Sequence, residues 1–261
     1  MDMKKLLALI LALVMTVCLF AACGEKEETV ADPSGEVRPL AEEALELIVK
    51  RDQETLLTKL SDPDPVVDPG KSIVAKFDAY AAVLTGFEAQ VDTWEITDEL
   101  KAEVKAYAAA KADAVLASFK AEGIQSVNTV GAVVNANGKA KLLDVSAKEF
   151  DYGYAELYTA PGNMAEFVGV DFGGAHPAKK VLPSATPEEV TANSDIAAKC
   201  TAADADALAK IKTMTIDELK VVTDNIFAKI DTYVVDTDVS ISYKKIDNAW
   251  KINSIGISAV E

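Results

Sequence analysis

The sequence predicts an α+β fold in which helices pack on an antiparallel sheet built from two β-hairpins. Apolar residues recur at helical spacing over much of the chain. Two other segments alternate apolar and polar residues, and each surrounds a dipeptide suited to a tight hairpin turn. Half of the 261 residues are hydrophobic, so the chain can bury a sizeable core.

The N-terminus has the pattern of an export signal. Lys4 and Lys5 form a basic start, residues 6–22 are apolar, and the small residues Ala21 and Ala22 follow. A membrane-spanning anchor is the competing interpretation, because the run approaches the length of about 20 residues that crosses a bilayer.

Cys23 separates these two interpretations. The segment Phe20-Ala21-Ala22-Cys23 resembles the lipobox of bacterial lipoprotein precursors. In that family the cysteine receives a diacylglyceryl group and becomes the first residue of the mature chain. The resemblance implies a signal peptide at 1–22 and lipidation of Cys23, and it leaves an ordinary signal with an incidental cysteine as the alternative. Two acyl chains anchor a protein stably to a membrane.

The remaining chain divides into a tether and a body. Residues 23–38 comprise the lipidated cysteine and a polar, flexible tether, and residues 39–261 form a single α+β extracytoplasmic domain. Residues 153–214 are less regular and are a candidate insert. With Cys23 lipidated, Cys200 is the only cysteine of the mature chain, so no intrachain disulfide is expected and Cys200 is expected to be buried.

Helical signals dominate the first half of the body. Pro39 is expected to open the first helix, and Asp52 to cap a second one. Residues 71–86 keep helical periodicity and are expected to stop at Gly86. Thr97 is expected to cap a helix that runs to about Glu122.

The pattern then changes to strands. Residues 124–136 and 139–152 are predicted to form a hairpin around Asn137-Gly138, because both residues accept positive φ. Leu143, Val145 and Ala147 are expected on its buried face.

Capping and turn signals organise the second half. Residues 163–166 are expected to begin a short helix, and capping boxes start at Thr186 and Thr215. Residues 234–246 and 249–257 are predicted to form a second hairpin across Asp247-Asn248. In its first strand the apolar face is expected to carry Val239, Ile241 and Tyr243, which alternate with polar residues. The two hairpins are expected to join into one sheet with helices on one face.

The two ends of the body resemble a known group of proteins. Residues 45–52 and the closing hairpin at 243–252 are similar to NTF2-like (cystatin-like) lipoproteins of Gram-positive bacteria, as is the Asn137-Gly138-Lys139-Ala140 segment. Most members are domains of unknown function. The resemblance implies a cone-shaped sheet that often encloses a pocket, and some members are enzymes.

Charge excludes some functions. The chain has 42 acidic and 26 basic residues, a formal charge of −16, which excludes a nucleic-acid binder that uses a basic face.

No acid–base pair, zinc ligand set or phosphate loop is apparent, so no catalytic residue, metal or cofactor is predicted. The run Asp62, Asp64, Asp68 is interpreted as a solvated turn, with a calcium loop as the alternative.

An aromatic cluster is the remaining candidate site. Phe150, Tyr152 and Tyr154 share one face of a predicted strand, with Tyr158 and His176 nearby. Such residues are expected in the core, and a ligand or peptide platform is the alternative.

These observations favour a non-enzymatic binding or interaction module, anchored by lipid to the outer face of the cell membrane. Its expected partners are the membrane, through the lipid, and an envelope protein or small ligand of unknown identity. A small-molecule enzyme using an NTF2-like pocket is the alternative. A transporter's substrate-binding subunit would need alternating β-α units, which the hairpins do not provide.

Overall fold

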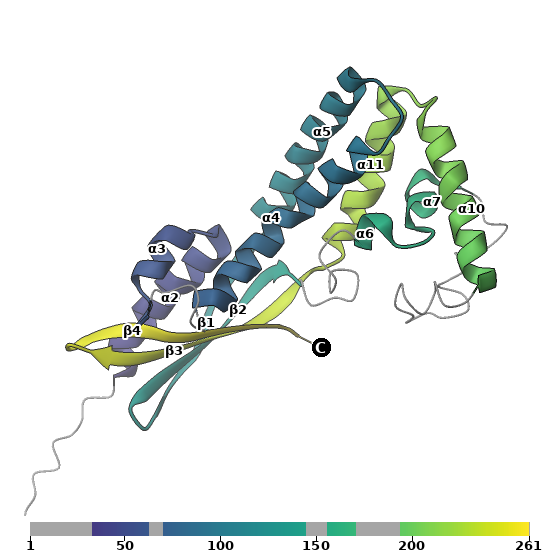
Figure 1. Cartoon of the computed structure of the whole chain (residues 1–261). Coiled ribbons are helices and arrows are strands. Elements are labelled where there is room, and N and C mark those ends of the chain that lie inside the picture. The colour runs from purple at the N-terminus through teal and green to yellow at the C-terminus, as the bar shows by residue number, and fades with distance from the viewer. Residues whose placement is uncertain (1–32, 63–69, 145–155, 171–193, 261) are drawn as a thin grey trace, which may run out of the picture.

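The computed structural model describes residues 33–62, 70–144, 156–170 and 194–260. The strands form two hairpins. Helices precede the first hairpin and lie between the first and the second along the chain (Figure 1). The elements in chain order are α2 (Ser34–Lys50), α3 (Gln53–Thr58), α4 (Gly70–Asp92), α5 (Asp98–Ala117), β1 (Lys120–Val130), β2 (Val133–Leu143), α6 (Glu156–Thr159), α7 (Asn163–Val168), α10 (Ser194–Ile211), α11 (Ile216–Asp231), β3 (Val234–Ile246) and β4 (Ala249–Ala259).

The four strands form one antiparallel sheet in the order β1-β2-β3-β4. The two hairpins join where β2 pairs with β3, as the sequence predicted. Helix α2 packs on one face of the sheet, against β1, β2 and β3. The strands alternate accordingly, with Val134, Ala136, Val239 and Ile241 buried and Asn137, Lys139, Asp238 and Ser240 exposed. The fold is therefore α+β, with helices on an antiparallel sheet.

The first hairpin turns at a different place from the one predicted. Its turn is Gly131-Ala132, and Asn137-Gly138 lies in the middle of β2. A Cβ at Gly138 would lie 2.9 Å from Ile124 Cδ1 and 3.3 Å from Leu45 Cδ2. Glycine therefore leaves room there for Ile124 of β1 and Leu45 of α2, and does not form a turn.

This shift also moves the strand boundaries. The second strand ends at Leu143, and its buried positions are even-numbered up to Leu142. Leu143 itself is buried, as predicted. Residues 145–152 of the predicted strand, Val145 and Ala147 among them, lie outside the described residues.

The second hairpin forms as predicted. Asp247 and Asn248 make its turn with φ of 49° and 63°, a conformation that suits the right-handed twist of a hairpin. Ser242 pairs with Ser254 but Tyr243 pairs with Ile252, so Asn253 forms a bulge in β4.

The predicted helix caps are confirmed where the structure describes them. The side chains of Asp52 and Thr97 accept hydrogen bonds from backbone N–H groups of the next turn, and Thr215 forms a complete capping box with Glu218. Asn163 begins α7, and Cys200 is buried in α10. The box at Thr186 lies outside the described residues.

Three helix boundaries differ from the expectation. Helix α2 begins at Ser34, so Pro39 lies inside it and residues 34–38 are helical. Val37 is completely buried, so the extra turn is stabilised by the burial of an apolar side chain. Helix α4 continues through Gly86 because Phe87 and Val91 beyond it are buried, which outweighs the cost of about 1 kcal/mol for a helical glycine. Helix α5 ends at Ala117, before the predicted Glu122, because the chain enters β1 at Lys120.

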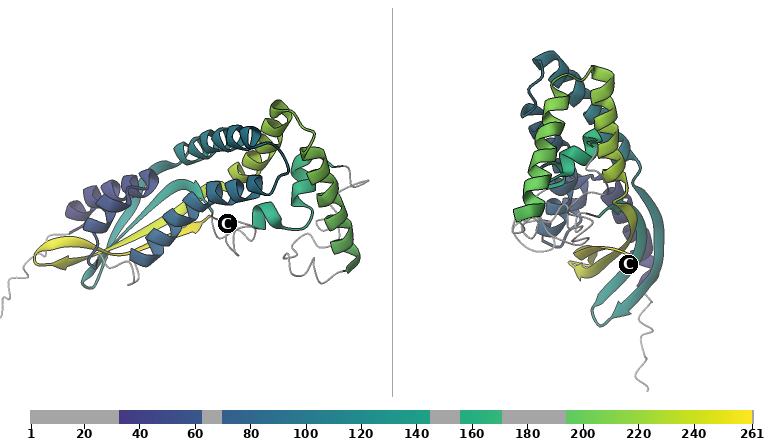
Figure 2. Two further views of the ribbon diagram at one scale, coloured as in Figure 1. Left: turned by 45° about the horizontal axis from the view of Figure 1, so that its top comes forward. Right: turned by 90° about the vertical axis from the view of Figure 1, so that its right-hand side faces the viewer.

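The molecule is elongated, with the sheet, α2 and α3 at one end and α5, α7, α10 and α11 at the other (Figure 1, Figure 2). Helix α4 runs between the two ends. At the helical end, Phe87 contacts the rings of Trp94, Tyr158 and Phe227, with centroid distances of 6.1, 5.9 and 5.8 Å.

The described part of the candidate insert shares the core of the molecule. Leu157, Tyr158, Met164 and Phe167 belong to the same continuous hydrophobic cluster as the sheet residues. None of the described helices combines the length and apolar character needed to cross a membrane.

Candidate functional site

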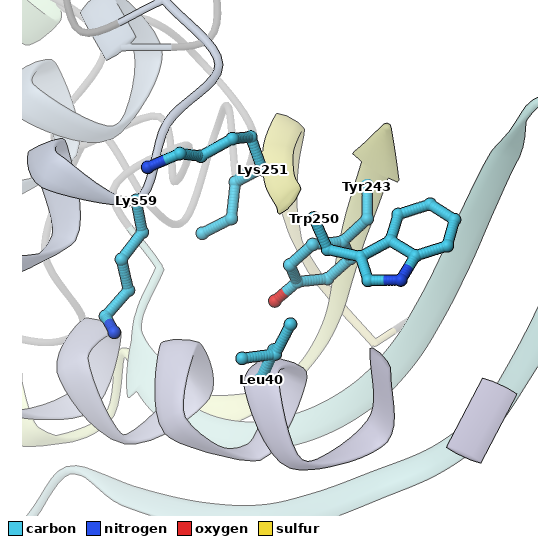
Figure 3. Close-up of a pocket in the computed structure, with 6 residues that line it drawn as sticks. Leu40, Lys59, Tyr243, Trp250 and Lys251 are labelled. Carbon is cyan, nitrogen blue, oxygen red and sulfur yellow. The ribbon is translucent and has the colours of Figure 1, made fainter. Parts of the chain in front are cut away.

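A partly open pocket lies at the sheet end, between α2, the segment after α3, and the closing hairpin (Figure 3). Its volume is about 180 Å³. The residues that line it are Leu40, Lys59, Tyr243, Trp250, Lys251 and Ile252.

Backbone hydrogen bonds bring these distant residues together. Arg51, with φ of 57°, ends α2 sharply and lets α3 turn back beside it. The segment after α3 then pairs with β4: Ile252 N–H donates to Lys59 O at 2.9 Å, and Ser61 N–H donates to Ile252 O at 2.7 Å. This short parallel bridge places Lys59 beside Lys251.

Tyr243 projects from β3 toward Leu40 and the interior of the pocket (Figure 3). Its side chain is only 2% exposed, and its hydroxyl has no hydrogen-bond partner among the described residues. Burial, together with the nearby Glu43 carboxylate, raises the pKa of Tyr243 well above its ordinary value. The hydroxyl therefore stays protonated at neutral pH, and its oxygen atom is itself buried.

The two lysines of the pocket have different partners. Lys59 Nζ forms an ion pair with Glu43 Oε1 at 2.7 Å. Lys251 Nζ donates to the carbonyl oxygen of Thr58 at 3.1 Å, and no carboxylate pairs with it within the described ranges. An ammonium group has three donors, so Lys251 keeps capacity for another acceptor.

Trp250 forms the rim of the pocket. Its Nε1 donates to Glu36 Oε2 at 2.8 Å, and Lys245 Nζ lies 5.0 Å from the indole centroid. The Trp250 hydrogen bond and the charge of Lys245 lower the pKa of Glu36. The half-buried indole thus links the closing hairpin to α2 and leaves part of its surface for the pocket.

Of the predicted aromatic platform, the structure describes only Tyr158. It is 1% exposed, and its hydroxyl donates to Val83 O at 2.8 Å. Its ring packs against Phe87 within the core and is not open to a ligand. Phe150, Tyr152, Tyr154 and His176 lie outside the described residues, as does Cys23, the predicted lipidation site.

The described residues contain no cluster of three or more His, Cys, Asp or Glu side chains suited to a metal ion. Of the aspartates considered for calcium, Asp62 is described, and Asp64 and Asp68 lie outside the described residues.

The lining of the pocket provides one phenol hydroxyl, two ammonium groups and apolar side chains. Sequence reasoning placed Tyr243 on the inner face of its strand but did not find the pocket. The parallel bridge joins positions almost 200 residues apart in the chain, and no local pattern signals it.

Comparisons of the chain with protein-family models, with curated proteins and with solved structures find no match.

Proposed function

We propose that this protein is a lipid-anchored, extracytoplasmic binding module of the cell envelope with an NTF2-like body, and that its ligand site is the Tyr243 pocket. Cys23 carries the anchor, and the body acts without chemical conversion of its ligand. The export signal and the lipobox-like segment support the location.

The observation that carries the binding role is the Tyr243 hydroxyl. A buried hydroxyl without a hydrogen bond costs about 1–3 kcal/mol, so such groups are rare in folded proteins. This one faces a pocket lined by further unused donor capacity. A bound acceptor would remove the cost.

The position of the pocket agrees with an anchored protein. Residues 24–33 span at most about 35 Å when fully extended. Helix α2 begins at Ser34, and its first turns carry Glu36 and Leu40 beside the pocket. The sheet end of the molecule is therefore the end held near the membrane.

Anchoring is tested by incorporation of radiolabelled fatty acid into the wild-type protein and the Cys23→Ser variant. We expect label in the wild type alone. Equal labelling of both proteins would remove the anchor from the proposal.

Binding is tested on the chain from residue 24 onward, which contains every described residue. The sequence has two tryptophans, so its ¹H–¹⁵N spectrum has two indole N–H signals, and Trp250→Phe identifies the one at the pocket. Trp94 is 1% exposed at the helical end and is an internal reference. We expect a small amphiphilic probe to move the Trp250 signal and leave Trp94 in place. If butyrate, 1-butanol and n-butylamine all leave Trp250 unmoved, the pocket is not a ligand site.

A further inference from the structure

We infer that the ligand group recognised by the Tyr243 pocket is a small carboxylate that carries a short alkyl chain. This inference rests on the proposed function, since it identifies the class of ligand for the same pocket. It follows from the donors, the charges and the walls of the site.

The charged side chains of the lining, Lys59 and Lys251, are donors only, and the Tyr243 hydroxyl is able to donate or to accept. The protonated Tyr243 hydroxyl is able to donate one hydrogen bond, and Lys251 Nζ has donors left after its bond to Thr58 O. A ligand that presents acceptors therefore suits the two lysines. A carboxylate has two acceptor oxygens and a negative charge, whereas an ammonium ligand has no acceptor to offer them.

The local charge favours an anion with a single charge. Lys59 and Lys251 contribute two positive charges, and Glu43, paired with Lys59 at 2.7 Å, contributes one negative charge. At the rim, Lys245 and Glu36 lie 3.5 Å apart and offset each other. Among the lining residues and these ion-pair partners, one positive charge remains, in a chain whose formal charge is −16. A monoanion neutralises it, and a phosphate dianion leaves an excess of negative charge beside Glu43.

The walls and size of the pocket specify the rest of the ligand. Leu40, Ile252 and the indole of Trp250 provide apolar surface beside the donors. The volume of about 180 Å³ lies below the range of about 300–1,000 Å³ that holds drug-sized ligands. A short alkyl chain matches these walls and this volume, whereas a nucleotide is too large.

The test compares three probes with the same four-carbon chain and different head groups: butyrate, 1-butanol and n-butylamine. Each is added to about 50 mM at constant ionic strength and pH 7, and the Trp250 indole signal is followed with Trp94 as reference, because small ligands bind weakly. We expect a saturable shift with butyrate that exceeds the shifts with the other two probes.

Three variants test the assigned residues. Lys251→Gln removes the ammonium group that donates to Thr58 O, and Tyr243→Phe removes only the hydroxyl. Each substitution is expected to weaken butyrate binding by at least about fivefold. Lys244→Gln is the matched control, because Lys244 is the cross-strand partner of Lys251 and does not line the pocket. It is expected to change binding less than about twofold.

The outcomes separate this inference from the proposed function. If 1-butanol or n-butylamine shifts Trp250 as strongly as butyrate, the pocket binds ligands but does not select a carboxylate, and the inference is wrong. Equal weakening by Lys251→Gln and Lys244→Gln also overturns it, because the effect is then one of general charge. If no probe moves Trp250, both the inference and the proposed function fail.

Discussion

Two buried tyrosines, one at each end of the molecule, differ in the surroundings of a single oxygen atom. Tyr158 at the helical end and Tyr243 at the sheet end are 1% and 2% exposed, and burial raises the pKa of both. The Tyr158 hydroxyl donates to Val83 O at 2.8 Å, whereas the Tyr243 hydroxyl has no partner among the described residues. Equal burial therefore accompanies a hydrogen-bonded hydroxyl in the core and, at the proposed site, a hydroxyl that has no partner in the described part of the chain.

The largest expected effect is at the helical end. Phe87 is fully buried and contacts three aromatic rings, so Phe87→Ala should lower the free energy of unfolding by about 3–5 kcal/mol. Chemical denaturation measures this loss. The variant should still bind butyrate under native conditions, because Phe87 does not line the pocket. Loss of binding by a folded Phe87→Ala variant would show that the two ends are not independent.

The second prediction concerns how α2 packs on the sheet. A Cβ at Gly138 would meet Ile124 at 2.9 Å, so Gly138→Ala should destabilise the protein by about 1–3 kcal/mol. Gly256 lies in β4, and a Cβ there would find no atom closer than 3.9 Å. Gly256→Ala is therefore the matched control and should leave the denaturation midpoint nearly unchanged. Similar losses in both variants would argue against close packing at Gly138.

Two dipeptides show what the sequence was able to predict. Asp247-Asn248 and Asn137-Gly138 are both turn signals locally, but only the first is a turn. The second dipeptide serves a contact with α2, whose Leu45 lies almost a hundred residues earlier. Capping residues such as Asp52, Thr97 and Thr215 were predicted correctly because their hydrogen bonds stay within one turn of the chain.

The candidate site was less predictable than the fold. Tyr243 was expected to face inward, from its place in an alternating strand, and it does. Nothing local indicated that its hydroxyl would lack a partner, since this depends on Leu40 and Lys59 arriving from other elements. The aromatic cluster was the stronger local signal, yet its described member Tyr158 belongs to the core.

The third prediction tests the hydrogen bond that distinguishes the two tyrosines. Tyr158→Phe keeps the ring and removes the donor to Val83 O, so it should lower the free energy of unfolding by about 1 kcal/mol. The denaturation midpoint should fall with no change in the slope of the transition. An unchanged midpoint would show that this bond does not contribute.

The most direct test is the variant Tyr243→Phe. Its free energy of unfolding is compared with that of Tyr158→Phe, and its butyrate binding is compared with that of the wild type. Because the Tyr243 hydroxyl has no partner among the residues that the structure describes, its removal should leave the free energy of unfolding unchanged or raise it by about 1 kcal/mol. It should also weaken the response of Trp250 to butyrate. A loss of stability equal to that of Tyr158→Phe, with butyrate binding intact, would contradict the account and make Tyr243 an ordinary core residue.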